Sequence, residues 1–340
     1  MHIDKKCLGL LTACMSLAFV LNPADASAAA KKWHPGHYML KWGNTGTKPF
    51  EKIINNPNFE GGESMHSWRE FEKEKGVYNF NSLVNELNYL QARKKRLMLI
   101  FQDKNWGGQS APCVPDYMLK DPKYQGGQVV VRSRNGTVKQ CMAKRWVPAV
   151  MDRMIALYTA LGKRFDKEPY FEAIKTTENS AVWAGGFSVA AQTAQLKRQM
   201  LALANAFPQT QVFQGLNWSK AEIAVLFPYA HSIGIGVGGP DILPTYPTDA
   251  YPFYRQYYGK MPLAIDGQNN GVSPYLRSGD VDFDDLYTFA ITDPRGLRVN
   301  YVIWSSSENG TWSFQNKVVP LVNRHKGYIN SGCPLSISCK

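Results

Sequence analysis

Short apolar segments alternate with longer amphipathic segments along most of the chain, and this alternation constrains the fold more than any other feature. It predicts an α/β fold with a parallel sheet. We expect eight strands, at residues 37–42, 59–64, 96–102, 171–176, 210–215, 232–237, 262–266 and 299–305. Apolar residues at helical spacing predict helices at 80–92, 148–165, 189–206 and 281–292. Eight strands with crossovers in 340 residues favour a single-domain (β/α)₈ TIM barrel.

An open, doubly wound sheet is the alternative architecture. Such sheets usually carry a glycine-rich phosphate-binding turn after the first strand, and the segment G-N-T-G at 43–46 lacks that fingerprint. The main irregular insertion, at 105–145, follows the third strand. We therefore expect it to lie over the end of the barrel at which parallel strands finish.

The first 28 residues have the pattern of a secretory signal. Two lysines precede a nearly continuous apolar run at 7–21, and small residues follow at 26–28. We expect cleavage after Ala28, which leaves 29–340 as the barrel domain of a secreted or periplasmic protein. The run is shorter than the ~20 residues that cross a membrane, so we expect no membrane span. Residues 11–14 resemble a lipoprotein box, but the apolar region before Cys14 would be very short, so an anchor there ranks second.

Four cysteines remain after such a cleavage: Cys113, Cys141, Cys333 and Cys339. An even number of cysteines in an exported chain indicates disulfides. Four cysteines allow three pairings, and we expect Cys113–Cys141 and Cys333–Cys339 because these close the smallest loops. Neither pair has the spacing of a metal site, and we expect no metal and no organic cofactor.

The formal net charge of +12 suits a polyanionic partner, either nucleic acid or an acidic polysaccharide. The basic residues are scattered, and the sequence has no zinc-finger or RNA-binding signature, so we expect no nucleic acid partner. Aromatic residues make up 12% of the chain and suit both a core and sugar stacking. We expect a monomer that acts on a poly- or oligosaccharide, with an acidic polymer among the candidates.

Acidic residues fall at the ends of four expected strands: Glu63, Glu178, Asp266 and Glu308. Barrel enzymes carry their chemistry at these ends, so the four acids would converge on one cleft. Glycoside hydrolysis needs a carboxyl group that protonates the leaving oxygen and a second that attacks the sugar or activates water. Crowded carboxylates also raise one another's pKa, which supplies a usable acid.

Each acid also has a structural interpretation. Glu178 could begin a helix, where acidic residues are stabilising. Asp266 could cap the turn before Gly267. Glu63 and Glu308 could bind sugar hydroxyls or hold other site residues. We predict Glu178 and Asp266 as the catalytic pair.

Several motifs resemble clan A glycoside hydrolases, a group with β-galactosidase and endoglycanase members. The segment S-W-R-E-F-E-K-E-K-G-V-Y-N-F-N-S-L at 67–83 resembles their strand-two region, 111–119 resembles the loop after strand three, and G-G-P-D at 238–241 resembles a turn after strand six. The resemblance implies a (β/α)₈ barrel, with Glu178 as the general acid/base after strand four. It also implies that the ring of Trp304 forms the floor of a sugar-binding subsite.

The chain departs from this pattern at two positions. Thr177 stands where the family usually has asparagine before the acid/base. The family's strand-seven glutamate would lie near Gly267, which Asp266 and Gln268 flank. Either Asp266 takes the nucleophile's role, or Glu308 or Glu63 does, or the chain has lost the nucleophile and binds sugar without cutting it.

The remaining candidates are polar and aromatic residues expected to bind substrate. They lie at or near strand ends: His37, Trp106, Asn179, Asn217, Trp218, Gln268 and Trp304. The sequence thus predicts a secreted glycosidase, with a non-catalytic carbohydrate-binding barrel and a polysaccharide lyase as alternatives.

Overall fold

The barrel is the core of the computed structural model, which describes residues 29–43, 45–105, 113–132, 139–180, 187–245, 248–268, 282–309 and 311–340. Eight parallel strands close on themselves in the order β1-β13-β12-β11-β10-β9-β5-β2. In chain order they are β1 (Gly36–Lys41), β2 (Gly61–Ser67), β5 (Arg96–Gln102), β9 (Phe171–Thr176), β10 (Gln211–Gly215), β11 (Gly236–Gly239), β12 (Leu263–Gly267) and β13 (Tyr301–Ser305). The predicted (β/α)₈ barrel is confirmed.

Side chains alternate between the inside of the barrel and the layer beneath the helices, because successive residues of a strand face opposite sides. On β1, Tyr38 and Leu40 belong to a small interior cluster, whereas Met39 packs in the large outer cluster. Both faces are apolar, which explains why the strands read as near-continuous apolar runs. The same alternation decides which polar side chains can reach the interior.

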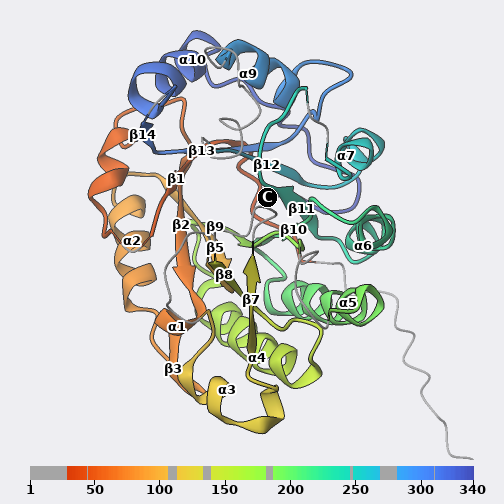
Figure 1. The fold of residues 1–340 in the computed structure, drawn as a ribbon. Coiled ribbons are helices and arrows are strands. Elements are labelled where there is room, and N and C mark those ends of the chain that lie inside the picture. The colour runs from red at the N-terminus through yellow and green to blue at the C-terminus, as the bar shows by residue number, and fades with distance from the viewer. Residues whose placement is uncertain are drawn as a thin grey trace, which may run out of the picture.

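Helices surround the strands (Figure 1). They are α2 (Asn81–Gln91), α4 (Pro148–Phe165), α5 (Val189–Ala206), α6 (Lys220–Ser232), α7 (Tyr251–Tyr257), α9 (Phe283–Ile291) and α10 (Val319–Arg324), with the single turn α1 (Trp68–Phe71) after β2. Side-chain oxygens cap the N-termini of α5 and α9: Ser188 accepts from the N–H of Ala191, and Asp282 accepts from that of Asp284. These caps help to fix where α5 and α9 begin.

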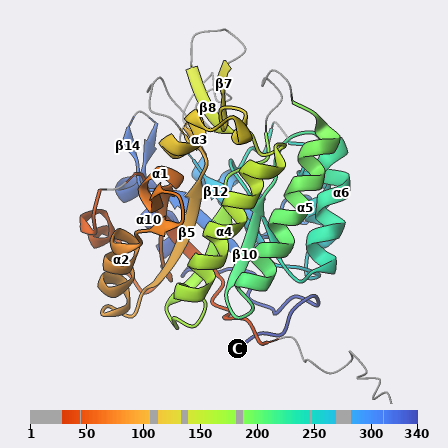
Figure 2. The ribbon, with the colours of Figure 1, turned by 90° about the horizontal axis from the view of Figure 1, so that it is seen from below.

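The insertion after β5 forms a small antiparallel sheet of order β6-β8-β7. Its elements are β6 (Lys104–Asn105), α3 (Asp116–Lys120), η2 (Pro122–Tyr124), β7 (Gln128–Arg132) and β8 (Lys139–Ala143). The Cys113–Cys141 disulfide joins the segment before α3 to β8. Figure 2 shows β7 and β8 at the end of the barrel opposite the C-terminus. Because β6 directly follows β5, this is the end at which the barrel strands finish, as predicted.

Short elements and a second disulfide complete the chain. They are η1 (Lys48–Lys52), β3 (Glu72–Glu74), β4 (Val77–Tyr78), β14 (Glu308–Asn309), β15 (Trp312–Ser313) and the π-helical turn η3 (Phe314–Val318). The second disulfide, Cys333–Cys339, lies near the C-terminus and pairs as predicted. No helix in the described part of the chain is long and apolar enough to cross a membrane.

Two strand predictions need correction. The sixth strand begins at Gly236, not at residue 232, because Ser232 ends α6, whose buried Ile223, Leu226 and Phe227 hold it as a helix. The second strand runs on to Ser67, so that Glu63 lies within it rather than at its end. The expected signal at 1–28 lies outside the described residues.

Candidate active site

Glu178 and Asp266 line one small pocket at the end of the barrel where the strands finish. Glu178 lies two residues beyond β9, the fourth barrel strand, and Asp266 lies in β12, the seventh. Gln268, Gly238 and other residues of neighbouring strand ends complete the pocket. The structure therefore brings the two predicted catalytic carboxyl groups together.

A buried ion cluster, here called the lysine triad, consists of Lys175, Glu63 and Asp266. The ammonium of Lys175 lies 2.9 Å from Glu63 Oε2 and 2.5 Å from Asp266 Oδ1. All three side chains are at most 3% exposed. One ammonium offsets only one of two carboxylate charges, and Glu63 Oε1 has no hydrogen-bond partner among the described residues.

Burial raises the pKa values of both acids in the lysine triad. Burial raises the pKa of Glu63 to about 7, with Lys175 opposing the rise and Asp266 adding to it. Burial also raises the pKa of Asp266, against the nearby Lys175. The triad therefore retains a proton at a pH at which isolated carboxyl groups have lost theirs.

A second set of charges positions Glu178. Lys104, from β6, lies 3.1 Å from Glu178 Oε1 and donates to the carbonyl of Ser180 at 2.5 Å. Arg145 Nη1 donates to the Glu178 carbonyl oxygen at 2.8 Å. These contacts come from the insertion and its junction with α4, so the insertion fixes both the side chain and the backbone of Glu178.

The residue before Glu178 is held by the same arginine. Arg145 donates to both carboxylate oxygens of Asp103 and to Thr177 Oγ1, and the Thr177 hydroxyl donates to Asp103 at 2.7 Å. All three side chains are buried. Charge-assisted, two-pronged contacts of this kind fix geometry strongly. The threonine that departs from the family pattern thus anchors the strand end.

Asn179 is buried away from the pocket. Its Nδ2 donates to the Trp218 carbonyl at 2.8 Å and to Glu222 at 3.1 Å, and its Oδ1 accepts from the Asn217 N–H at 3.0 Å. These bonds tie the ends of β9 and β10 together. Trp218 is 43% exposed beside this junction, which suits a stacking surface at the rim.

Trp304 and His37 do not reach the pocket. On β13, Ile303 and Ser305 face the interior of the barrel, so Trp304 between them faces the layer beneath the helices. There Trp304 is fully buried and donates from Nε1 to His37 Nδ1 at 3.0 Å. The other His37 nitrogen lies 3.2 Å from the Tyr328 carbonyl. Burial lowers the pKa of His37 to about 4. The structure thus places both residues in the packing layer under the helices.

Three other predicted residues take different positions. Glu308 is held in the β14–β15 hairpin by Lys52 at 2.9 Å and by Ser313, apart from the pocket residues. Gln268 lines the pocket and donates to Asp266 Oδ2 at 3.2 Å. Trp106 lies outside the described residues.

Four charged residues at or near the site were not predicted from the sequence: Lys175, Lys104, Arg145 and Asp241. Lys175 could have been noticed, because a lysine in a strand as apolar as 171–176 needs a buried partner. Asp241 follows β11, and burial raises the pKa of its carboxyl group to about 7, with the charges of Glu178 and Asp266 adding to the rise. The two other residues belong to an insertion whose folding has no sequence signal.

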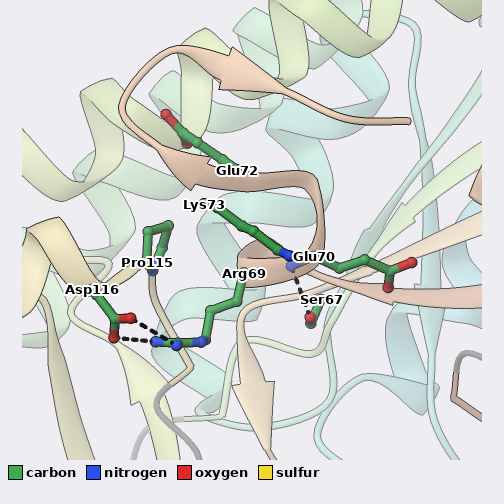
Figure 3. Close-up of a pocket in the computed structure, with 7 residues that line it drawn as sticks. All are labelled: Ser67, Arg69, Glu70, Glu72, Lys73, Pro115 and Asp116. Carbon is green, nitrogen blue, oxygen red and sulfur yellow. Dashed lines mark hydrogen bonds and ion pairs between the residues drawn. The ribbon is translucent and has the colours of Figure 1, made fainter. Parts of the chain in front are cut away.

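A second hollow lies between α1 and α3 (Figure 3). Across it Arg69 forms a two-pronged ion pair with the Asp116 carboxylate, at 2.6 Å and 3.0 Å. Glu72 bonds to Arg153 and Trp68, and Glu70 to His66. The Arg69–Asp116 pair holds α3 of the insertion against α1, and the other side chains bond to neighbouring elements of the barrel, so we assign the hollow a structural role.

Metal ligation is not indicated: among the residues that the structure describes, no group of three His, Cys, Asp or Glu side chains could hold a metal ion.

Comparison with known proteins gives structural matches alone. No protein-family model and no curated protein matches the sequence. The catalytic domain of β-amylase from Paenibacillus polymyxa aligns with a TM-score of 0.52 at 8% identity, over 81% of this chain and 93% of that one. Endo-glycoceramidase II from Rhodococcus sp. aligns at 0.52 and 12%, over 86% and 80%. A β-galactosidase from Marinomonas ef1 aligns at 0.52 and 8%, over 86% and 59%.

The chain has the barrel fold of these glycoside hydrolases. At such low identity the match concerns the fold, and function must be argued from the site. The site has two carboxyl groups in one pocket, at the ends of the fourth and seventh strands.

Proposed function

We propose that the protein is a secreted glycoside hydrolase that cleaves a poly- or oligosaccharide. The observation that carries the proposal is the shared pocket of Glu178 and Asp266 at the ends of the fourth and seventh strands. Two carboxyl groups facing one space are the minimum that glycoside hydrolysis requires. Two disulfides in the described chain support an oxidising compartment.

Glu178 would act as the general acid/base. It protonates the glycosidic oxygen as the bond to the sugar breaks, and it then takes a proton from the attacking water. Lys104 and Arg145 would hold it at the pocket, as their contacts with its side chain and carbonyl indicate.

Asp266 would be the second carboxylate. Burial disfavours its charge, and the Lys175 ammonium at 2.5 Å stabilises the carboxylate form against that penalty. Gln268, which donates to the other oxygen, orients the group.

The test compares wild type with Glu178→Gln and Asp266→Asn on a neutral β-glucan, a galactan, polygalacturonate and alginate. Each variant should lose about 10²-fold or more of the release of reducing ends, the scale of general acid–base catalysis. Asp152→Asn, on the exposed face of α4, is the matched control and should keep full activity.

The strongest alternative is a barrel that binds saccharide without cutting it. One observation favours it: both carboxylate oxygens of Asp266 accept hydrogen bonds within the protein. Binding of one glycan without product would support this alternative. Release of an unsaturated sugar that absorbs in the ultraviolet would instead indicate a lyase.

A further inference from the structure

Asp241 lies at the end of β11, between the two catalytic strand ends. In the barrel order β11 neighbours β12, which carries Asp266, and only β10 separates it from β9, after which Glu178 lies. The three residues before Asp241, at 238–240, line the same pocket as Glu178 and Asp266. Asp241 thus directly follows residues that line the pocket, and the charges of Glu178 and Asp266 act on its carboxyl group.

The backbone at Asp241 is held in a left-handed conformation, with φ of 66°. Few residues other than glycine adopt it, and aspartate and asparagine are among those that tolerate it. The Tyr251 hydroxyl, from α7, donates to the Asp241 carbonyl at 2.7 Å and accepts from the Leu243 N–H at 2.9 Å. Surrounding structure therefore imposes the conformation, as is common where a side chain serves function.

The carboxyl group of Asp241 has no compensating partner in the part of the chain that the structure describes. Its Oδ1 is buried without a hydrogen bond, and no ion pair among the described residues includes it. The charged groups that influence it are the carboxylates Glu178 and Asp266. The neighbouring lysines are already engaged, Lys104 by Glu178 and Lys175 by the lysine triad.

Burial, with the two negative charges beside it, raises the pKa of Asp241 to about 7. Tyr251, the other titratable group in contact, has its pKa raised by burial and stays neutral. Among the described residues, Glu178 and Asp266 each pair with a lysine and Asp241 pairs with no cation, so Asp241 can hold a proton that is separate from that of the lysine triad.

We propose that Asp241 holds the exchangeable proton of the resting site and passes it to Glu178 for catalysis. This inference rests on the proposed hydrolase function. It meets a requirement of that function, because Glu178 must carry a proton in order to act as an acid, whereas its ion pair with Lys104 needs the carboxylate.

The proton transfers balance over one cycle. Asp241 gives its proton to the Glu178 carboxylate, and Glu178 then gives it to the glycosidic oxygen, which leaves with the bonding electron pair. Water supplies hydroxide to the sugar, and its remaining proton returns to Glu178 and then to Asp241. The net change is the addition of one water across the glycosidic bond.

Asp241→Asn tests the relay, because asparagine has the same shape, tolerates the left-handed backbone and carries no exchangeable carboxyl proton. On whichever of the four polysaccharides the wild type hydrolyses, kcat/KM of the wild type should fall as pH rises through about 7. The variant should be about 10²-fold slower near pH 6 and should lack this fall, so the difference shrinks toward pH 9. Asp152→Asn should retain the wild-type profile. An Asp241→Asn profile with the same fall would overturn the inference.

Carboxyl NMR tests proton storage separately from activity. Protein labelled with ¹³C at aspartate carboxyl groups should show a resonance that titrates near pH 7, and Asp241→Asn should remove it while the resonance of Asp266, whose pKa is also raised, remains. Separate labelling of glutamate isolates Glu63, which has a pKa in the same range. Absence of such an aspartate signal would refute the inference whatever the activity. If the signal is present but no polysaccharide is cleaved, the hydrolase proposal fails and so does the catalytic role of the relay.

Discussion

Replacing Lys175 with methionine should destabilise the protein markedly, because the lysine triad would then hold two buried carboxyl groups with no cation. Removing one partner of a buried ion pair costs about 3–5 kcal/mol. An unfolding entropy of about 2.1 cal/mol/K per residue gives about 0.7 kcal/mol/K for this chain. The expected fall in Tm is therefore about 4–7 °C.

The sign of the pH dependence follows from the carboxyl pKa values. Burial already holds the pKa of Glu63 above its usual value, and loss of Lys175 removes the charge that opposes this rise. An acid whose pKa is raised by folding is protonated in both states at low pH, and it destabilises the fold progressively as pH rises from its unfolded to its folded pKa. The Tm difference between wild type and Lys175→Met should thus be larger at about pH 8 than at about pH 4.

Thermal unfolding followed by circular dichroism at the two pH values measures this difference. Lys163→Met, on the exposed side of α4, is the matched control and should shift Tm little. A triple variant that also carries Glu63→Gln and Asp266→Asn should lose most of the pH dependence. The reasoning would be refuted by a Lys175→Met protein with the Tm of wild type at pH 8. It would also be refuted by a Tm deficit relative to wild type that is larger at pH 4 than at pH 8.

Two further predictions concern stability away from the pocket. His66 is buried between Glu70 and Glu86, each 2.9 Å from a ring nitrogen; burial acts to lower its pKa, but these carboxylates raise it overall. The raised pKa adds stability that is present below about pH 6.5 and is lost as pH rises through the folded pKa. His66→Gln should therefore lower the free energy of unfolding in urea by about 1–3 kcal/mol near pH 6 and by less near pH 9. An equal loss at both pH values would contradict this prediction. Replacing both cysteines of Cys113–Cys141, which spans 28 residues, with serine should lower the free energy of unfolding by about 3–4 kcal/mol. The same change at Cys333–Cys339, which spans 6 residues, should lower it by about 2 kcal/mol, and the reverse order would contradict the loop-entropy argument.

Several elements could be predicted because their signals are local. The third and fourth strands and the helices α4 and α5 begin and end where the apolar pattern predicts. Both disulfides pair as the shortest loops suggest. The start of the sixth strand was predicted wrongly because α6 has apolar residues on most sides, which hides its helical period.

The candidate site could be predicted only in part. Strand ends and the barrel rule indicate Glu178 and Asp266. They do not indicate the side to which Trp304 points, because that depends on the register of β13 against its neighbours. They also cannot reveal the Lys175 contacts, since Glu63 and Asp266 lie 112 and 91 residues away.

The sequence by itself determined the alternation of strands and helices, and with it the barrel and the end of the barrel that carries the acids. Only the tertiary structure decided the charge state of those acids. Lys104 reaches Glu178 and Lys175 reaches Asp266, whereas no cation among the described residues pairs with Asp241. The physical reason is that periodicity is a property of neighbouring residues, whereas a pKa depends on burial and on charges brought within a few ångströms by closure of the barrel.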